Sequence, residues 1–242
     1  MANDIKDYIG QCSTCNEYES QQQKEPLLTH DVPDHSWSKL GIDIFTLHSQ
    51  DCLITVDYYS DFWELDILKA TSSITSIDCL KVYFSRHGIP DIVVTDNGPQ
   101  LASTEFNEFA REWEFEHVTS SPYHSQSNGK AESTVKIAKK LVKKSQKSGN
   151  DLWKSILDWR NTPTEGMSSS PVQRLMSQRT RHSLPIADVL LKPQVIEHVY
   201  DNIKLKRQKA KLHYDKHAKE LSDLQIGQQI RMVPLPNDRD KI

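Results

Sequence analysis

Three acidic side chains occupy positions where a negative charge would not stabilise an ordinary hydrophobic core. Asp43 interrupts an apolar run, Asp96 directly follows the apolar segment 91–95, and Glu132 lies in the first turns of an expected long helix. Burial of a carboxylate is costly unless the group is paired or binds a metal. Acids at strand ends and at a helix start can converge at one edge of a sheet, where three of them suit a hard divalent cation. The alternative is three unrelated acids on turns and at a helix N-terminus, where Asp and Glu are favoured anyway.

The spacing of these acids and the residues around them are a more specific indication of function. Between Asp43 and Asp96 lie 52 residues, and between Asp96 and Glu132 lie 35. The surrounding motifs are Gly41-Ile42-Asp43, Val94-Thr95-Asp96-Asn97-Gly98-Pro99-Gln100, Ser121-Pro122-Tyr123-His124-Ser125-Gln126-Ser127-Asn128-Gly129-Lys130-Ala131-Glu132 and Trp159-Arg160-Asn161-Thr162-Pro163. Together they resemble the integrase core of LTR retroelements, and among these the gypsy-type retrotransposon branch, over about residues 36–185.

This resemblance implies an RNase H-like fold and a set of catalytic carboxylates that binds two Mg²⁺ or Mn²⁺ ions. By position, Asp43 would contact both ions, Asp96 one of them and Glu132 the other. Two ions roughly 3.5–4 Å apart can activate an attacking oxygen and stabilise a leaving one at phosphorus. The implied reaction is hydrolysis near the 3′ ends of the element DNA, followed by attack of the freed 3′-hydroxyl on a target strand.

The hydrophobic pattern predicts an α/β fold with a mixed five-stranded sheet flanked by helices. The first three strands are close enough in sequence to form an antiparallel meander, and the last two follow helical crossovers and should be parallel. Expected strands are 40–45, 52–58, 63–68, 91–95 and 115–118, and expected helices are 72–86, 103–113 with Thr104 as a cap, 128–146, 151–159, one beginning at 171 with Ser170 as its cap, and a basic stretch within 195–220.

Lysines follow Glu132 along its expected helix. Lys136, Lys139 and Lys143 lie at i+4, i+7 and i+11, so they share its face. Lysines beside the carboxylates can hold DNA phosphates without reading much sequence. The alternative is an ordinary solvated lysine face.

A loop rich in Ser, Pro, Asn and Gly covers residues 119–129 ahead of that helix. We expect it to be mobile, and its Tyr123, Gln126 and Asn128 are candidates to contact a splayed DNA end. The alternative for each of these residues is a plain surface connector.

Cys12 and Cys15 have the C-x2-C spacing of two zinc ligands. With His30 and His35 they approach a zinc-finger pattern, but the text between lacks the apolar residues of a packed finger. In the family that the chain resembles, a histidine pair precedes the cysteines, and no histidine precedes Cys12. We therefore expect a partial zinc site, with residues 1–35 as the remnant of a zinc-binding amino-terminal domain and linker.

The carboxyl-terminal part divides further. Residues 36–185 would form the catalytic core, 186–221 a basic helical linker, and 222–242 the incomplete start of an SH3-like domain, so that this truncated chain would be a weak catalyst at best.

Charge distribution and hydrophobicity limit the classes of protein to which the chain can belong. The net charge of −3 over 242 residues hides two basic stretches of +6 each, at 130–147 and 204–219, which can bind a polyanion. The amino-terminal segment has no secretory signal, and no run approaches the roughly 18–20 apolar residues of a membrane span. We expect a nuclear protein that forms homo-oligomers on double-stranded DNA, both element ends and target.

Two other functions remain open at this stage. A domesticated or decayed integrase would grip DNA without cutting it. A ribonuclease acting on RNA–DNA hybrids would share the fold, and fold alone does not decide function.

Overall fold

The computed structural model describes residues 31–119 and 128–216, together with the single positions 5, 8, 12, 26, 27, 29 and 218. The chain divides into two compact units, residues 29–208 and residues 1–28 with 209–242. Cys15, Tyr123, Gln126 and the expected SH3-like start all lie outside the described residues, so the predictions about them and about the domain boundaries stay predictions. Within the described part, no helix is both long and apolar enough to span a lipid bilayer.

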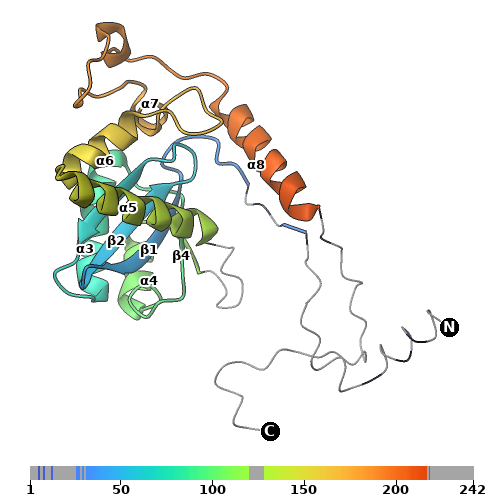
Figure 1. Ribbon diagram of the computed structural model, residues 1–242. Coiled ribbons are helices and arrows are strands. Elements are labelled where there is room, and N and C mark those ends of the chain that lie inside the picture. Colours follow the sequence, from blue (N-terminus) through green and yellow to red (C-terminus); the bar gives the residue numbers. More distant parts are fainter. Residues whose placement is uncertain are drawn as a thin grey trace. The chain divides into compact units, whose positions relative to one another are not determined.

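The sheet has five strands in the spatial order β3-β2-β1-β4-β5 (Figure 1). β1 pairs with β2, and β2 with β3, in antiparallel fashion, whereas β1–β4 and β4–β5 are parallel. The predicted mixed five-stranded sheet, with its meander and two crossovers, is therefore confirmed. The strands are β1 Lys39–Leu47, β2 Gln50–Asp57, β3 Trp63–Ile67, β4 Ile92–Thr95 and β5 Glu116–Thr119.

A two-residue turn, His48-Ser49, joins β1 to β2. Both residues have positive φ, 49° and 62°, as in the hairpin turns whose twist matches that of the flanking strands. The turn fixes the register in which Asp43 lies opposite Ile54.

The helices begin at polar caps that the sequence partly revealed. Ser72, Ser103, Asp151 and Ser170 each accept a backbone N–H with their side chain. The expectation that Thr104 caps its helix is wrong, because Thr104 is the first helical residue and the extended Ser103 accepts Phe106 N–H. The helices are α3 Ser73–His87, α4 Thr104–Glu112, α5 Gly129–Ser148, α6 Leu152–Asn161, α7 Pro171–Met176, the 3-10 turn η2 Asp188–Leu191 and α8 Val199–Asp215.

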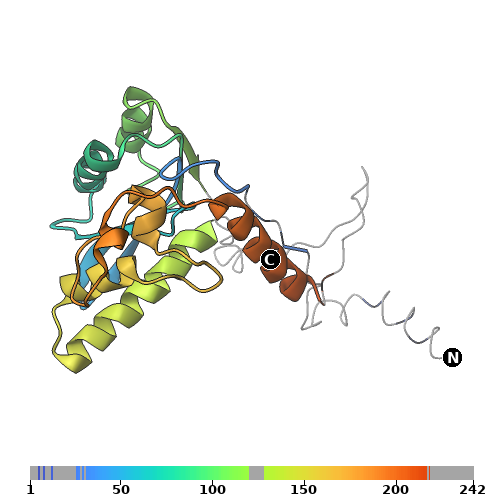
Figure 2. The same ribbon diagram turned by 90° about the horizontal axis from the view of Figure 1, so that it is seen from above.

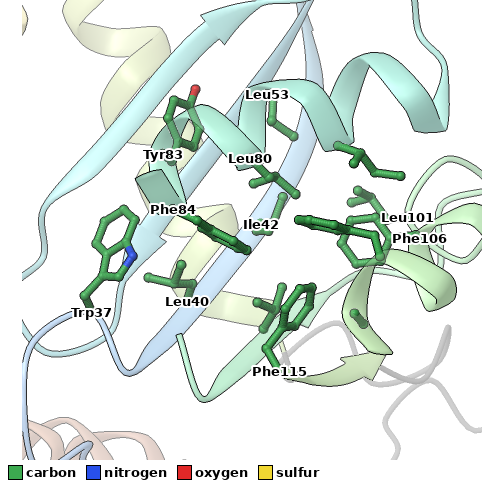
Figure 3. Packing of buried hydrophobic residues seen from close by; sticks show 14 of the residues in the cluster. Trp37, Leu40, Ile42, Leu53, Leu80, Tyr83, Phe84, Leu101, Phe106 and Phe115 are labelled. Carbon is green, nitrogen blue, oxygen red and sulfur yellow. The ribbon is translucent and has the colours of Figure 1, made fainter. Parts of the chain in front are cut away.

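The helices flank the sheet on two faces (Figure 2). Leu40 and Ile42 of β1 pack on the face covered by α3 and α4, in the cluster drawn in Figure 3. Phe45 of β1 instead packs with residues of α5 and α6 on the other face. This alternation along one strand decides which way Asp43 points.

Candidate active site

Asp43 and Asp96 are brought together by the parallel pairing of β1 and β4. Ile42 and Thr95 are register partners, and the two aspartates follow them directly. Adjacent strands lie about 4.8 Å apart, and side chains at matched positions share a face. Two aspartates with 52 residues between them in sequence thus become neighbours at the carboxyl end of β4.

The face that these aspartates share is the one covered by α5. Ile42 packs into the cluster beneath α3 and α4, so the next residue, Asp43, points to the opposite face along with Phe45. The Asp43 side chain is half-buried there.

Glu132 reaches the same region from α5. The helix buries Ala131, Val135, Ala138 and Val142 toward the sheet, as the sequence predicted. Glu132 is half-buried beside this stripe, in the first turn of the helix.

The electrostatics of Asp43 show that the three carboxylates share one region. Burial, the negative charge of Asp96 and that of Glu132 together raise the pKa of Asp43 to about 6, against the opposing effects of the Ile44 N–H and of Lys139. Each negative neighbour makes ionisation of Asp43 less favourable. The structure therefore places Asp96 and Glu132 within electrostatic reach of Asp43.

Asp96 is held by its own loop. The Gly98 N–H donates to Asp96 Oδ1 over 3.2 Å, and a Cβ at position 98 would lie 3.1 Å from that oxygen. The glycine of the Asp96-Asn97-Gly98 motif thus gives the carboxylate room above the backbone, a reason that the motif alone did not reveal.

A chain of polar contacts continues behind Asp96. The Thr95 hydroxyl donates to Asp96 O over 2.8 Å and lies 2.9 Å from His117 Nε2. Burial lowers the pKa of His117, which favours its neutral form. His117 therefore supports the strand end that carries Asp96.

The residues fit a divalent cation in chemistry and charge. All donors are carboxylate oxygens, the type that Mg²⁺ and Mn²⁺ prefer, and a bound cation would relieve the repulsion that raises the Asp43 pKa. Within the part of the chain that the structure describes, no three His, Cys, Asp or Glu side chains approach closely enough to hold a metal together. Joint coordination by Asp43, Asp96 and Glu132 would need their side chains to move closer.

The three lysines predicted to contact DNA differ in their surroundings. Lys139 is half-buried, with Nζ 5.2 Å from the centre of the Phe45 ring, and it lowers the pKa of Asp43. Lys136 and Lys143 are exposed on the same helix. Lys139 is thus the one of the three that the described structure places beside the carboxylates.

Asn128, predicted as a candidate DNA contact, is not on the surface of the described structure. Its side chain is buried, and Nδ2 donates to Ile42 O over 2.9 Å.

Of the candidate zinc ligands, Cys12 is half-buried.

A buried arginine outside the predicted site residues supports the start of α5. The Arg174 guanidinium is fully buried, donates from Nε to Ser60 O over 2.8 Å and pairs through Nη2 with Asp61 Oδ2 at 2.9 Å. Asp61 also pairs with Lys130, two residues before Glu132. Nothing in the local sequence around Arg174 marks it, because its contacts with Ser60 and Asp61 join residues more than 100 positions apart.

The chain is similar in sequence to known proteins. Residues 33–125 match the family model of the integrase core domain, a segment that contains Asp43 and Asp96 and ends before Glu132. An uncharacterized protein of Caenorhabditis elegans is 28% identical over 241 residues, covering 95% of this chain and 18% of that protein. The Gag-Pro-Pol polyprotein of sheep pulmonary adenomatosis virus is 30% identical over 145 residues, covering 55% of this chain and 8% of the polyprotein.

The fold has a counterpart among solved structures. A chain of the simian T-cell lymphotropic virus intasome superposes with a TM-score of 0.60 at 24% identity, covering 77% of this chain and 70% of that one. The chain spans less than a fifth of the length of the curated relatives it matches. Its fold is thus the RNase H-like mixed sheet, and its segment from residue 33 to residue 125 matches the integrase core domain.

Proposed function

We propose that this chain is the catalytic part of an integrase-type polynucleotidyl transferase of a gypsy-type LTR retrotransposon, which processes 3′ ends and joins element DNA to target DNA. The observation that supports the proposal is the register of β1 and β4, which sets Asp43 and Asp96 side by side on the sheet face covered by α5, the helix that carries Glu132. Desolvated carboxylates gathered beside cations are typical of a functional site.

The chain's own residues would hold and orient the reacting groups. Asp43, Asp96 and Glu132 would ligate two Mg²⁺ or Mn²⁺ ions, which when bound polarise the phosphodiester and activate the attacking oxygen. Lys139, beside Asp43, would hold a DNA phosphate near the carboxylates, and Lys136 and Lys143 would extend that contact along α5.

The reaction would proceed by two in-line displacements at phosphorus. In the first, a water oxygen bonds to phosphorus near the end of the element DNA and the 3′ oxygen leaves, taking up a proton. In the second, this 3′-hydroxyl attacks a target phosphodiester, and the target's 3′ oxygen leaves. In each step one P–O bond forms and one breaks, without a covalent protein intermediate. The hydrolysis converts one phosphodiester into a phosphomonoester, whereas the joining step exchanges one phosphodiester for another.

The oligomeric state, the cellular location and a partial zinc site belong to the same proposal. Joining two element ends to one target requires more than one catalytic core, so we propose a homo-oligomer on double-stranded DNA, acting in the nucleus. Cys12 and Cys15 would contribute part of a zinc site in the amino-terminal segment.

One observation favours a second function, a DNA-binding protein that no longer cuts. The three carboxylates are near one another, yet no cluster of three potential ligands in the described residues is tight enough to hold a metal. A chain in which that closure never occurs would keep the lysine face and lose the chemistry.

Strand joining on a branched, dumbbell-shaped DNA with Mn²⁺ or Mg²⁺ distinguishes the two, with Glu132→Gln as the matched variant. Metal-dependent product from the wild type and none from the variant is the expected result. Absence of product from both, with retained DNA binding in a gel-shift assay, would favour the binding protein. Cleavage of an RNA–DNA hybrid in place of branched DNA would contradict both.

A further inference from the structure

The residue that begins α5 is bonded directly to the strand that carries Asp43. Asn128 Nδ2 donates to Ile42 O over 2.9 Å, across 86 residues of sequence. Asn128 stands at the N-cap position, but its side chain makes no cap hydrogen bond. The amide is thus directed at β1 instead of at its own helix.

Both ends of this bond are close to the catalytic carboxylates. Ile42 immediately precedes Asp43. Asn128 is four residues before Glu132, about one helical turn and about 6 Å of rise, on the same side of the helix. A displacement of Asn128 along β1 would therefore carry Glu132 with it.

Gly41 provides the space through which the Asn128 side chain passes. A Cβ at position 41 would lie 3.3 Å from Asn128 Oδ1 and 3.1 Å from Tyr58 Cε2. Gly41 is not among the residues with positive φ, so its backbone does not require glycine. The need for glycine here is one of space.

The buried side-chain amide of Asn128 contributes little net stability to the fold. Asn128 is 2% exposed, and its Oδ1 is a buried oxygen without a hydrogen-bond partner among the described residues. A buried polar atom without a partner has an energetic cost that offsets what the single Nδ2 hydrogen bond contributes. Asn161 differs: it is equally buried, but its side chain bonds Leu157 O, Thr180 Oγ1 and Thr180 N.

We propose that Asn128 is a positioning residue that sets the distance between Glu132 and Asp43, and that Gly41 is present to admit it. This inference rests on the proposed function, because it assigns Asn128 a task at the same carboxylates. It replaces the expected role of Asn128 as a direct DNA contact.

Mn²⁺ binding to the full chain without DNA, followed by the electron paramagnetic resonance signal of free Mn²⁺, tests the proposal. Loss of a group that orients metal ligands typically weakens binding 10–100-fold, so we expect Asn128→Ala to raise the Mn²⁺ dissociation constant about tenfold. Gly41→Ala should shift it in the same direction, and the double variant should be no weaker than Asn128→Ala alone. Asn161→Ala is the matched control, with a larger loss of thermal stability and a change in Mn²⁺ affinity of less than about twofold.

Wild-type Mn²⁺ affinity in Asn128→Ala, or an equal loss in Asn161→Ala, would overturn the proposal. Failure of the wild type to bind Mn²⁺ would overturn it as well, since no metal ligands would then need positioning. Binding with the expected pattern of variants but without strand joining would support the role of Asn128 and contradict the proposed function.

Discussion

Asp43 in β1 and Asp96, the first residue after β4, each directly follow one member of the register pair Ile42–Thr95 of two parallel strands. Like charges placed side by side on one face of a sheet are destabilising. Burial, and after it this repulsion, raise the pKa of Asp43. The fold thus keeps two charges together at a cost in stability, as functional sites commonly do.

Asp43→Asn should stabilise the metal-free chain while abolishing strand joining. A carboxyl group whose pKa is raised by folding destabilises the native state above that pKa, and neutralisation removes the effect. Because solvent screens this half-buried group, we expect a gain of about 1–2 kcal/mol at pH 7.5, well below the full pKa difference. Urea unfolding in the presence of EDTA measures it.

Asp66→Asn is the matched control for this change. Asp66 is also on a strand, but it accepts a hydrogen bond from Tyr83 Oη over 2.7 Å, so its replacement should bring no gain in the free energy of unfolding. Equal stabilisation by both variants would mean that net charge, and not the Asp43–Asp96 pair, is responsible.

Arg174→Met should destabilise the fold by about 3 kcal/mol in urea unfolding at neutral pH. The change removes the buried partner of Asp61 and leaves the carbonyl oxygens of Ser60 and Ser169 without their donors. Arg111 is exposed on α4, and Arg111→Met should stay within about 0.5 kcal/mol. A cost for Arg174→Met no larger than that of Arg111→Met would show that the buried ion pair is energetically neutral.

Asp61 should make the fold sensitive to strong acid. Burial raises its pKa, but the charges of Lys130 and Arg174 outweigh burial and hold that pKa below its usual value. The resulting stability is fully present above the unfolded-state pKa of about 3.9 and is lost as pH falls further through the folded-state value. In urea unfolding from pH 7 to 2.5, Asp61→Asn should start lower and fall less steeply below pH 4, and parallel profiles would exclude this role.

Lys139→Ala should weaken DNA binding and lower the salt dependence of the binding constant by about one phosphate contact. The adjacent Lys140 is exposed and points about 100° away around the helix, so Lys140→Ala should change neither quantity. Fluorescence anisotropy titrations over a range of NaCl concentrations provide both slopes. Identical slopes for the two variants would indicate a diffuse lysine effect.

The elements that place the aspartates could be predicted because their signals are local. The apolar runs and the cap at Ser170 lie in consecutive residues, and so the sheet and helix order was correct. The cap of α4 was wrong by one residue because Ser103 and Thr104 are both good caps, and only the backbone conformation decides between them.

The contacts that adjust the site could not be read from the sequence for a physical reason. Asn128 with Ile42, and Arg174 with Asp61, join residues that are 86 and 113 positions apart. Their side chains meet only after the sheet and α5 have packed. A polar residue in a loop motif therefore suggested a surface contact, whereas the folded chain buries it.

The two outer strands of the sheet have a consequence for association between chains. An exposed strand edge offers unpaired backbone groups to which another chain can add, and inward-pointing charges or very short strands discourage this. β3 carries Glu64, engaged by His87 and Arg160, and Asp66, engaged by Tyr83, while β5 has only four residues. A strand from another chain that paired with β3 would have to accommodate these charges. Both edge strands of the sheet therefore disfavour the addition of further strands and growth into fibrils.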